Sequence, residues 1–429
     1  MHDQLIVDRA ANQRPRPEAT AAPARRPRAT VVVVGIIFLL LILEALSYGA
    51  IALLASLGRE EVRRTADIFQ EQSAKIRSLL EPGPRLLQLD PELGWRYRAG
   101  HRDALNRMNA QGVRSAREYS IAPGPGVIRV AAFGDSFVYC NEVADRDSWP
   151  AAVEGMFSQL EVLNYGVGGY GTDQAFQLYL AEGSRLSPDV VVIGFAPVDL
   201  GRTVNVYRRF ISNHELPLVK PRFVLDAEGE LALLPNPLRE PADYEPYLRE
   251  PERIRELGRH DQWYRPAVYE NPLFDRSATV RLFVALGLKI QDRYLDADRM
   301  FAGSVFNRSS TAFKIQTALF EKFARAVDSS GAAPLVVIFP DRESIVAGRQ
   351  GRPRSSDPLI AELRRRRIAT LDLTGGFLAE GHDVDIDRWF MPGGHYSPLA
   401  NRQAASTLGR YISEMPTARG WTSPGRPER

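Results

Sequence analysis

Short apolar runs alternate with segments of helical periodicity through most of the chain after residue 120. The apolar runs lie at 127–133, 162–167, 190–195, 335–339 and 370–373. The helical segments lie at 149–160, 173–186, 311–328 and 358–367, and a last helix carries the apolar stripe Ala400, Ala404, Leu408 and Ile412. Buried runs that take turns with amphipathic helices are typical of a parallel sheet with helices on both faces. The pattern therefore predicts an α/β fold.

A longer apolar run near the N-terminus predicts a membrane-spanning helix at residues 31–57. The run is long enough to cross a bilayer as a helix, and its one charged residue is Glu44. A carboxyl group there indicates a neutral side chain, a span shifted toward an interface, or a partner helix in the membrane. A cleaved signal peptide is the rival interpretation, but the run exceeds a usual signal-peptide core and no small-residue site closes it.

The leader before this run, residues 1–30, is rich in proline, alanine and arginine. Its composition predicts disorder, and its arginines favour a cytoplasmic N-terminus by the positive-inside tendency. The chain after residue 57 is then expected outside the inner membrane, facing the periplasm or the cell exterior.

Three further segments flank or interrupt the α/β pattern. Residues 58–90 predict an amphipathic stalk that ends in a Pro/Gly-rich turn. Within the expected body, residues 91–415, the segment 201–307 lacks regular periodicity and predicts a cap over the functional site. Its Trp263 and Tyr264 suit either a sugar ring or the core of the cap. Residues 416–429 predict a disordered tail.

Composition excludes some classes of function. Lys+Arg number 55 and Asp+Glu 52 among 429 residues, and no basic stripe carries interleaved aromatics, so nucleic acid is not expected as a partner. The single cysteine, Cys140, excludes an internal disulfide and a cysteine-based zinc cluster. We expect neither a metal nor another cofactor.

Candidate chemistry centres on Ser136, which follows an apolar run in the sequence Gly134-Asp135-Ser136. A serine hydroxyl becomes a useful nucleophile when a base takes its proton and hydrogen-bond donors receive the oxyanion. The glycine-rich loop 164–172 can offer backbone N–H groups, and His395 lies in a loop just ahead of the last helix. These segments follow strands whose carboxyl ends should meet at one edge of the sheet.

The order of these blocks resembles that of the SGNH, or GDSL-type, hydrolases, over roughly residues 90–415. The resemblance implies a flavodoxin-like three-layer α/β/α fold with a parallel sheet, a cap insertion and, in this chain, an N-terminal transmembrane helix. It also implies a nucleophile at Ser136, a base at His395 and an oxyanion hole formed by the N–H groups of Ser136 and Gly169. Supporting positions are expected at Asp135, Asn164 and Asp199.

Two positions depart from the pattern of that family. An asparagine usually precedes the third-block aspartate, but Val198 precedes Asp199, so Asn205 is the candidate for the missing oxyanion donor. An aspartate usually lies two or three residues before the histidine, where this chain has Pro392 and Gly393. Two upstream carboxylates are candidates to orient His395: Asp387 and Asp385. A backbone carbonyl could instead orient the ring and leave a Ser-His dyad.

The resemblance includes envelope enzymes that remove or transfer acetyl groups on glycans. It therefore predicts a membrane-anchored serine esterase or acyltransferase that acts on O-acyl esters of a cell-envelope or exported polysaccharide. The contrasting hypothesis is an inactive SGNH-fold binding or scaffold protein of a polysaccharide assembly, and a third is a lipid esterase at the membrane surface. The expected partners are an acylated glycan, the inner membrane and the proteins of such an assembly.

Overall fold

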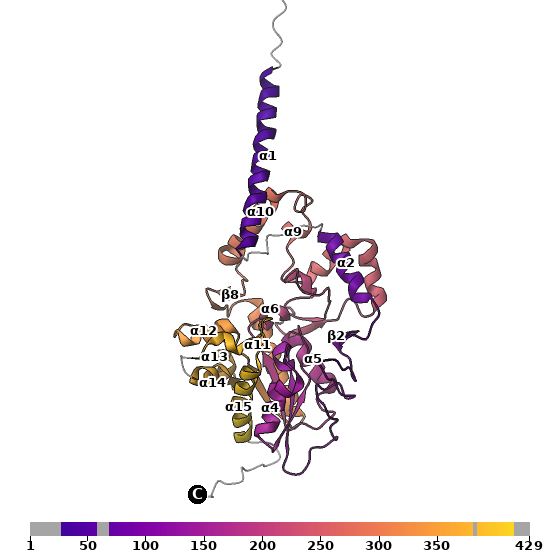
Figure 1. Cartoon of the computed structure of the whole chain (residues 1–429), viewed down its shortest axis with the longest axis vertical. Coiled ribbons are helices and arrows are strands. Elements are labelled where there is room, and N and C mark those ends of the chain that lie inside the picture. Colours follow the sequence, from indigo (N-terminus) through magenta and orange to yellow (C-terminus); the bar gives the residue numbers. More distant parts are fainter. Residues whose placement is uncertain (1–26, 58–67, 381–383, 416–429) are drawn as a thin grey trace, which may run out of the picture.

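The computed structural model describes residues 27–57, 68–380 and 384–415 (Figure 1). The predictions of a disordered leader, of the first part of the stalk and of a disordered tail lie outside these residues. The described part of the chain is elongated, with one long helix that projects from a body of helices and strands.

The body is built on a five-stranded parallel sheet with the strand order β11-β10-β5-β3-β4. Its strands are β3 (Ile128–Phe133), β4 (Leu160–Asn164), β5 (Val190–Phe195), β10 (Ala333–Ile338) and β11 (Thr370–Asp372). All residues of β3 and β5, the two strands at the centre of the site described below, are buried. The predicted parallel α/β fold is confirmed, and each apolar run corresponds to one strand.

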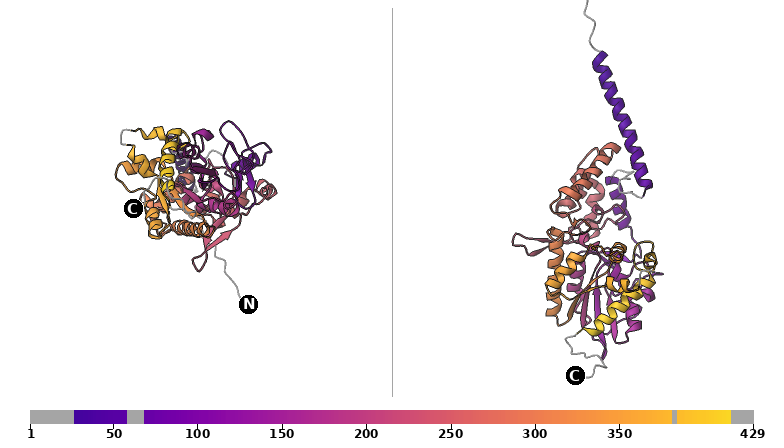
Figure 2. Two further views of the ribbon diagram at one scale, coloured as in Figure 1. Left: turned by 90° about the horizontal axis from the view of Figure 1, so that it is seen from below. Right: turned by 90° about the vertical axis from the view of Figure 1, so that its left-hand side faces the viewer.

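Helices cover both faces of the sheet, which gives three layers (Figure 2). One face packs against α4 (Trp149–Met156), α12 (Arg342–Arg349), α14 (Thr374–Ala379) and α15 (Pro398–Glu414). The other face packs against α5 (Thr172–Glu182), α11 (Thr311–Ser329) and α13 (Asp357–Arg365). Successive side chains of a strand point to opposite faces, so Val130 and Ala132 join the first layer while Ala131 and Phe133 join the second.

The segment 201–307 is more regular than its sequence indicates. It holds the antiparallel pairs β6 (Arg222–Leu225) with β7 (Leu231–Leu234) and β8 (Phe301–Ala302) with β9 (Val305–Phe306). Its helices are η3 (Arg208–Phe210), η4 (Pro241–Tyr244), α7 (Glu245–Arg249), η5 (Pro251–Arg253), α8 (Ile254–Leu257), η6 (Gly258–His260), α9 (Pro266–Tyr269), α10 (Ala278–Ile290) and the π-helix η7 (Gln291–Leu295). Most of these helices are too short to show a period in the sequence.

Trp263 and Tyr264 belong to the packing of this segment. The Trp263 Nε1–H donates to the Gly201 carbonyl at 2.9 Å, and Tyr264 stacks on Tyr269 with ring centroids 5.3 Å apart. Both residues pack against the buried cluster of the segment. Of the two interpretations open from the sequence, these contacts favour the core of the cap.

The described part of the expected stalk does not stand clear of the body. Helix α2 (Ile68–Leu80) buries Ile68, Gln72 and Ile76 against the cap segment. Arg209 donates from Nε to Gln72 at 2.7 Å, which fixes the helix to the cap. The following strands β1 (Leu87–Asp90) and β2 (Gly94–Tyr97) form an antiparallel pair. Strand β2 leads directly to the site, because Trp95 and Tyr97 contact the glycine loop.

The projecting helix α1 spans Pro27–Ser56, and its part Ala29–Ser56 is long and apolar enough to cross a membrane. Residues 29–43 are exposed, whereas the C-terminal part of α1 packs against α10 (Figures 1 and 2). The short helices α3 (Ser136–Tyr139) and α6 (Asp199–Thr203) follow β3 and β5 and hold residues of the site.

Candidate active site

Ser136 is the first residue of α3, in the turn that leaves the carboxyl end of β3. Asp135 is the N-cap residue of that helix, and its Oδ1 accepts the Phe137 N–H at 2.8 Å. A Cβ on Gly134 would lie 2.4 Å from Val138 Cγ2, so only glycine allows this sharp exit from the strand. Ser136 is 3% exposed, and no described residue is hydrogen-bonded to its hydroxyl. The residue is therefore fixed by its backbone while its hydroxyl is uncommitted.

A buried arginine joins the serine turn to the end of β5. Arg202 Nη1 lies 2.9 Å from Asp135 Oδ2 and 3.1 Å from Asp199 Oδ1. Asp199 Oδ2 also accepts the Ala196 N–H at 2.9 Å. Burial raises the pKa of Asp199 because it disfavours the charged form, and the nearby Asp135 carboxylate raises it further. Asp135 and Asp199 are thus connected through Arg202, which joins the turn after β3 to the turn after β5.

Loss of this arginine should destabilise the fold. We expect Arg202→Met to lower the free energy of unfolding by about 3–5 kcal/mol, because removing one partner leaves buried carboxylates uncompensated. Arg185→Met is the matched control, since the Arg185 side chain is 65% exposed and its pair with Glu182 lies at the surface. An exposed pair is worth roughly 0–1 kcal/mol. Thermal unfolding of both variants measures the difference, and equal midpoints would contradict the bridging role.

The glycine loop after β4 is held from both sides. Asn164 Oδ1 accepts the Gly166 N–H at 2.9 Å, and the Tyr97 hydroxyl accepts the Gly168 N–H at 3.0 Å. Trp95 Nε1 donates to the Gly168 carbonyl at 3.1 Å. Gly169 follows with φ +81°, a conformation that favours glycine. Its N–H makes no hydrogen bond to a described residue, so this donor is available to a ligand.

His395 lies in the tight turn that leads into α15, and its ring contacts the turn that carries the serine. Its Nδ1 lies 2.6 Å from Glu142 Oε2, and the Gly393 N–H donates to Glu142 Oε1 at 2.8 Å. The Phe137 ring, next to Ser136 in sequence, lies 5.6 Å from the His395 ring between centroids. The contact at Nδ1 leaves Nε2 as the ring nitrogen for proton transfer.

Glu142 is the carboxylate that sequence reasoning missed. Burial would raise the pKa of Glu142, but the hydrogen bonds from the His395 ring and from the Gly393 and His395 N–H groups outweigh it and lower that pKa. The lowered pKa favours the ionised carboxylate beside the imidazole. A carboxylate in this position can fix the orientation of the ring and stabilise an imidazolium, as the acid of a catalytic triad does.

The prediction that Asp387 orients His395 is wrong in its geometry. Asp387 lies in η8 (Ile386–Trp389), where its side chain is 67% exposed and pairs with Arg342 at 2.7 Å. The alternative Asp385 caps the same short helix by accepting the Asp387 N–H at 3.0 Å. Asp385 is engaged in its own turn and Asp387 with Arg342, while the ring nitrogen Nδ1 contacts Glu142, just after α3.

One sequence feature does mark the position of Glu142. A Cβ on Gly393 would lie 2.6 Å from Glu142 Oε2, so a side chain there would occupy the space of that carboxylate. Gly393 is one of the two positions where the resembled family has its aspartate. The absence of a side chain at Gly393 thus leaves room for the Glu142 carboxylate. The two residues are 251 positions apart along the chain, so the sequence alone does not connect them.

The prediction that Asn205 replaces the missing oxyanion donor is also wrong in its geometry. Asn205 is fully buried, and its Nδ2 donates to the Tyr207 carbonyl at 2.7 Å and to Asp261 Oδ2 at 2.8 Å. Both hydrogens of the Asn205 amide are therefore donated to residues of the cap segment 201–307 and are not available to an oxyanion. Val198 is 47% exposed and has no donor in its side chain.

We expect Asn205→Ala to affect stability and leave turnover unchanged. The substitution leaves an acceptor on Asp261 without its side-chain partner, which costs about 1–3 kcal/mol. The free energy of unfolding should fall by that amount, while kcat of the folded protein on an aryl acetate stays that of the parent. A selective loss of kcat would restore Asn205 to the oxyanion hole.

Another donor lies beside the glycine loop. Arg208 is buried and pairs with Glu215 through Nη2 at 2.6 Å, whereas its Nη1 has no hydrogen-bond partner among the described residues. Its guanidinium lies 3.7 Å from the point where a Cβ on Gly169 would be. A buried positive charge therefore lies next to Gly169, whose N–H makes no hydrogen bond to a described residue.

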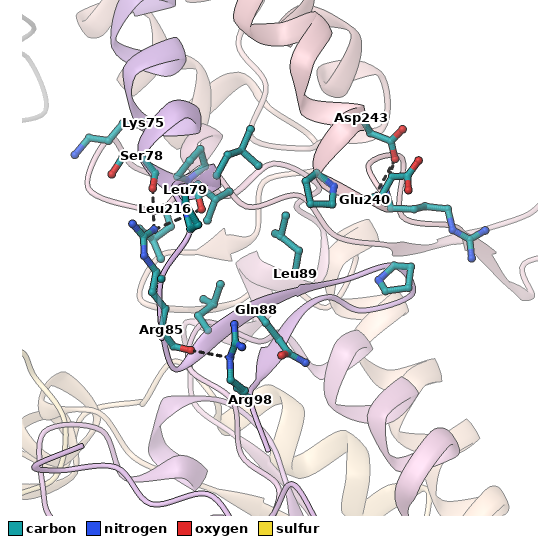
Figure 3. Close-up of a pocket in the computed structure, with 18 residues that line it drawn as sticks. Lys75, Ser78, Leu79, Arg85, Gln88, Leu89, Arg98, Leu216, Glu240 and Asp243 are labelled. Carbon is teal, nitrogen blue, oxygen red and sulfur yellow. Dashed lines mark hydrogen bonds between the residues drawn. The ribbon is translucent and has the colours of Figure 1, made fainter. Parts of the chain in front are cut away.

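A separate cavity of about 1120 Å³ lies between α2, β1 and the cap segment (Figure 3). Arg85 donates to the Ser78 carbonyl at 2.8 Å, and Arg98 Nε donates to the Arg85 carbonyl at 3.3 Å along one wall. Ser136 and His395 are not among the residues that line it. This cavity is therefore distinct from the candidate active site.

Comparison with known proteins finds its matches among solved structures. No family model matches the chain, and no curated protein matches it. A lipolytic protein of the G-D-S-L family from Desulfitobacterium hafniense is 13% identical, with 66% of this chain and 98% of that chain covered and a TM-score of 0.30. An acetylxylan esterase from Geobacillus stearothermophilus, solved as a catalytic mutant, is 12% identical, with coverages of 66% and 94% and a TM-score of 0.33.

A lipase/acylhydrolase from Enterococcus faecalis also matches, at 13% identity, coverages of 67% and 95%, and a TM-score of 0.31. These neighbours are GDSL-type lipolytic proteins and esterases.

Proposed function

We propose that this chain is a serine ester hydrolase or acyltransferase of the SGNH type with a Ser136-His395-Glu142 triad. The observation that carries the proposal is the hydrogen bond between His395 Nδ1 and Glu142 Oε2, 2.6 Å long. It holds the imidazole against the short segment 136–142, which also carries the free Ser136 hydroxyl. This contact supports the pairing of a base and a nucleophile that lie far apart in the sequence.

In the proposed reaction, Ser136 Oγ attacks the ester carbonyl carbon while His395 Nε2 takes the hydroxyl proton. The backbone N–H groups of Ser136 and Gly169 receive the oxyanion, and the charge of Arg208 favours it. The intermediate collapses as the ester C–O bond breaks, and the imidazolium returns its proton to the departing alcohol. Water or an acceptor hydroxyl then attacks the acyl-enzyme by the same route, which yields hydrolysis or transfer.

The proposed substrate is an O-acetyl ester of a cell-envelope or exported polysaccharide. The proposal follows from the resemblance to envelope enzymes and from the proposed anchoring of the domain through α1 in the inner membrane. The arginines of the leader favour a cytoplasmic N-terminus, which places the domain in the periplasm or outside the cell. Acetylated xylan is the first glycan to test, because one solved neighbour is an acetylxylan esterase.

A fluorophosphonate probe tests the proposed function on the full chain in detergent. Labelling should occur in the parent protein, be absent in Ser136→Ala, and persist in Ser329→Ala, where the replaced hydroxyl is exposed on α11. Release of acetate from acetylated xylan and from an aryl acetate then separates glycan from general ester activity. A folded parent protein that takes no label would favour the scaffold hypothesis instead.

A further inference from the structure

Helix α10 carries an apolar stripe that no described residue covers. Phe283, Leu286 and Ile290 are 63%, 54% and 44% exposed, and Tyr294 and Leu295 in the adjoining η7 are 66% and 73% exposed. The spacing of three or four residues from 283 to 294 places the stripe along one side of a helix. Singly exposed apolar residues are ordinary, but a contiguous stripe of large ones indicates an interaction surface.

The neighbouring side of α10 packs against α1. Ala278, Leu282 and Ala285 of α10 contact Ile51 and Leu54 of α1. The two helices lie side by side in both views (Figures 1 and 2). The uncovered stripe of α10 is therefore continuous with the exposed apolar surface of α1.

Glu44 joins the two helices at the start of α10. Its carboxylate accepts hydrogen bonds from the Ser277 hydroxyl at 2.8 Å, from the Ala278 N–H at 2.5 Å and from the Thr279 N–H at 3.2 Å. These donors belong to the N-terminal turn of α10, whose backbone N–H groups have no partner within the helix and carry partial positive charge. The charged residue that interrupts the apolar run is thus the cap of a second helix.

The length of α1 sets the depth of this contact. A span of about 20 residues that ends at Ser56, the last residue of α1, begins near Ile37. It includes Glu44 and also Ile51 and Leu54, the residues of α1 that α10 contacts, so α10 begins and continues at the level of the hydrocarbon. A carboxylate at this depth is costly unless it is paired, and the start of α10 supplies the partner. A lipid-facing position of α10 accounts for both its apolar stripe and its cap.

From these contacts we infer that α10 and η7 form a second membrane-embedded element, which lies beside α1 in the leaflet next to the catalytic body with its stripe against lipid. The inference rests on the proposed membrane anchor and adds a second attachment point, within the cap itself. Two attachments fix the orientation of the body relative to the bilayer, whereas a single helix would leave it free to tilt.

Spin labels on the full chain test this position. Single cysteines at Phe283, Leu286 and Ile290 carry a nitroxide, and the protein is reconstituted in vesicles of phosphatidylcholine and phosphatidylglycerol at a ratio of about 3:1, a composition that gives an anionic surface. Phe38→Cys on α1 is the lipid-facing reference. Leu180→Cys, an exposed apolar position of the body (58%), is the aqueous reference. The native Cys140 is buried, and an unsubstituted sample measures its background.

The three α10 labels should collide with oxygen in preference to a water-soluble nickel complex, with a ratio several-fold above that of Leu180 and close to that of Phe38. Labels on α10 that match Leu180, while Phe38 reports lipid, would overturn the inference and leave the anchor intact. An aqueous Phe38 label would instead overturn the anchor. Dipolar coupling between α10 labels with low exposure to both reagents would assign the stripe to a second copy of this chain, again against the inference. Thermal unfolding midpoints verify that each labelled variant is folded.

Discussion

Ser136→Ala should abolish esterase activity while the fold persists. Removal of a serine nucleophile that acts together with its histidine costs roughly four to six orders of magnitude in kcat. The side chain makes no hydrogen bond to a described residue, so its loss should leave the thermal unfolding midpoint nearly unchanged. The measurement is kcat on an aryl acetate and on acetylated xylan, beside the unfolding midpoint.

The control for this variant is Ser329→Ala, which removes a hydroxyl bonded only to its own helix at the surface. Its activity should equal that of the parent protein. A kcat of Ser136→Ala within about tenfold of that of the parent protein would show that another group attacks the ester. Loss of activity accompanied by unfolding would point to a structural role, and the near-complete burial of the residue makes that readout informative.

The parallel sheet and its helices could be predicted because each leaves a local pattern in the sequence. The central strands β3 and β5 are buried on both faces, so each is a continuous apolar run in the sequence, and the run 190–195 coincides with β5. Helix α15 follows from its apolar stripe and from Ser397, whose side chain caps it. Ser136 and His395 were found because each lies in a turn next to a regular element, and such turns are visible in the sequence.

The pairings within the site could not be found in that way. Glu142 contacts His395 across 253 residues, and its own backbone has φ +69°, a conformation that the sequence of a non-glycine residue does not suggest. Asn205 lies near the third block along the chain, but its side chain turns into the base of the cap, where Asp261 binds it. Proximity in sequence to the third block does not give the direction in which the side chain points.

The structure of the cap segment also depends on contacts between residues that are distant in the sequence. Its elements are short, and the length of α8 or α9 is only one helical turn, so no period accumulates. Their burial comes from contacts with one another and with α2, which lies more than a hundred residues earlier in the chain. An apparently irregular segment therefore folds into a layer that a distant helix helps to stabilise.

Glu142→Gln should lower kcat by about two to four orders of magnitude, because a neutral amide neither stabilises the imidazolium nor fixes the tautomer of His395. Asp387→Asn is the matched control, since this carboxylate pairs with Arg342 at the surface. Its kcat should stay within about twofold of the parent, as for a change at an exposed ion pair. The kcat of the two variants shows which carboxylate orients His395. Equal kcat values for Glu142→Gln and Asp387→Asn would contradict the role of Glu142.

Moving the carboxylate back to the other turn gives a stricter test of the same role. Glu142→Gly suits the positive φ of that position, and it should lose activity as Glu142→Gln does. Gly393→Asp alone should also impair the protein, since its Cβ would lie 2.6 Å from Glu142 Oε2. In the double variant the collision is absent and an aspartate stands near the ring, so kcat should recover at least about tenfold over Glu142→Gly, part of the loss that a correctly placed carboxylate accounts for. Recovery in the double variant alone is expected only if the carboxylate acts through His395. A folded double variant that is no faster than Glu142→Gly would show that Glu142 holds the turn in shape and does not serve the imidazole.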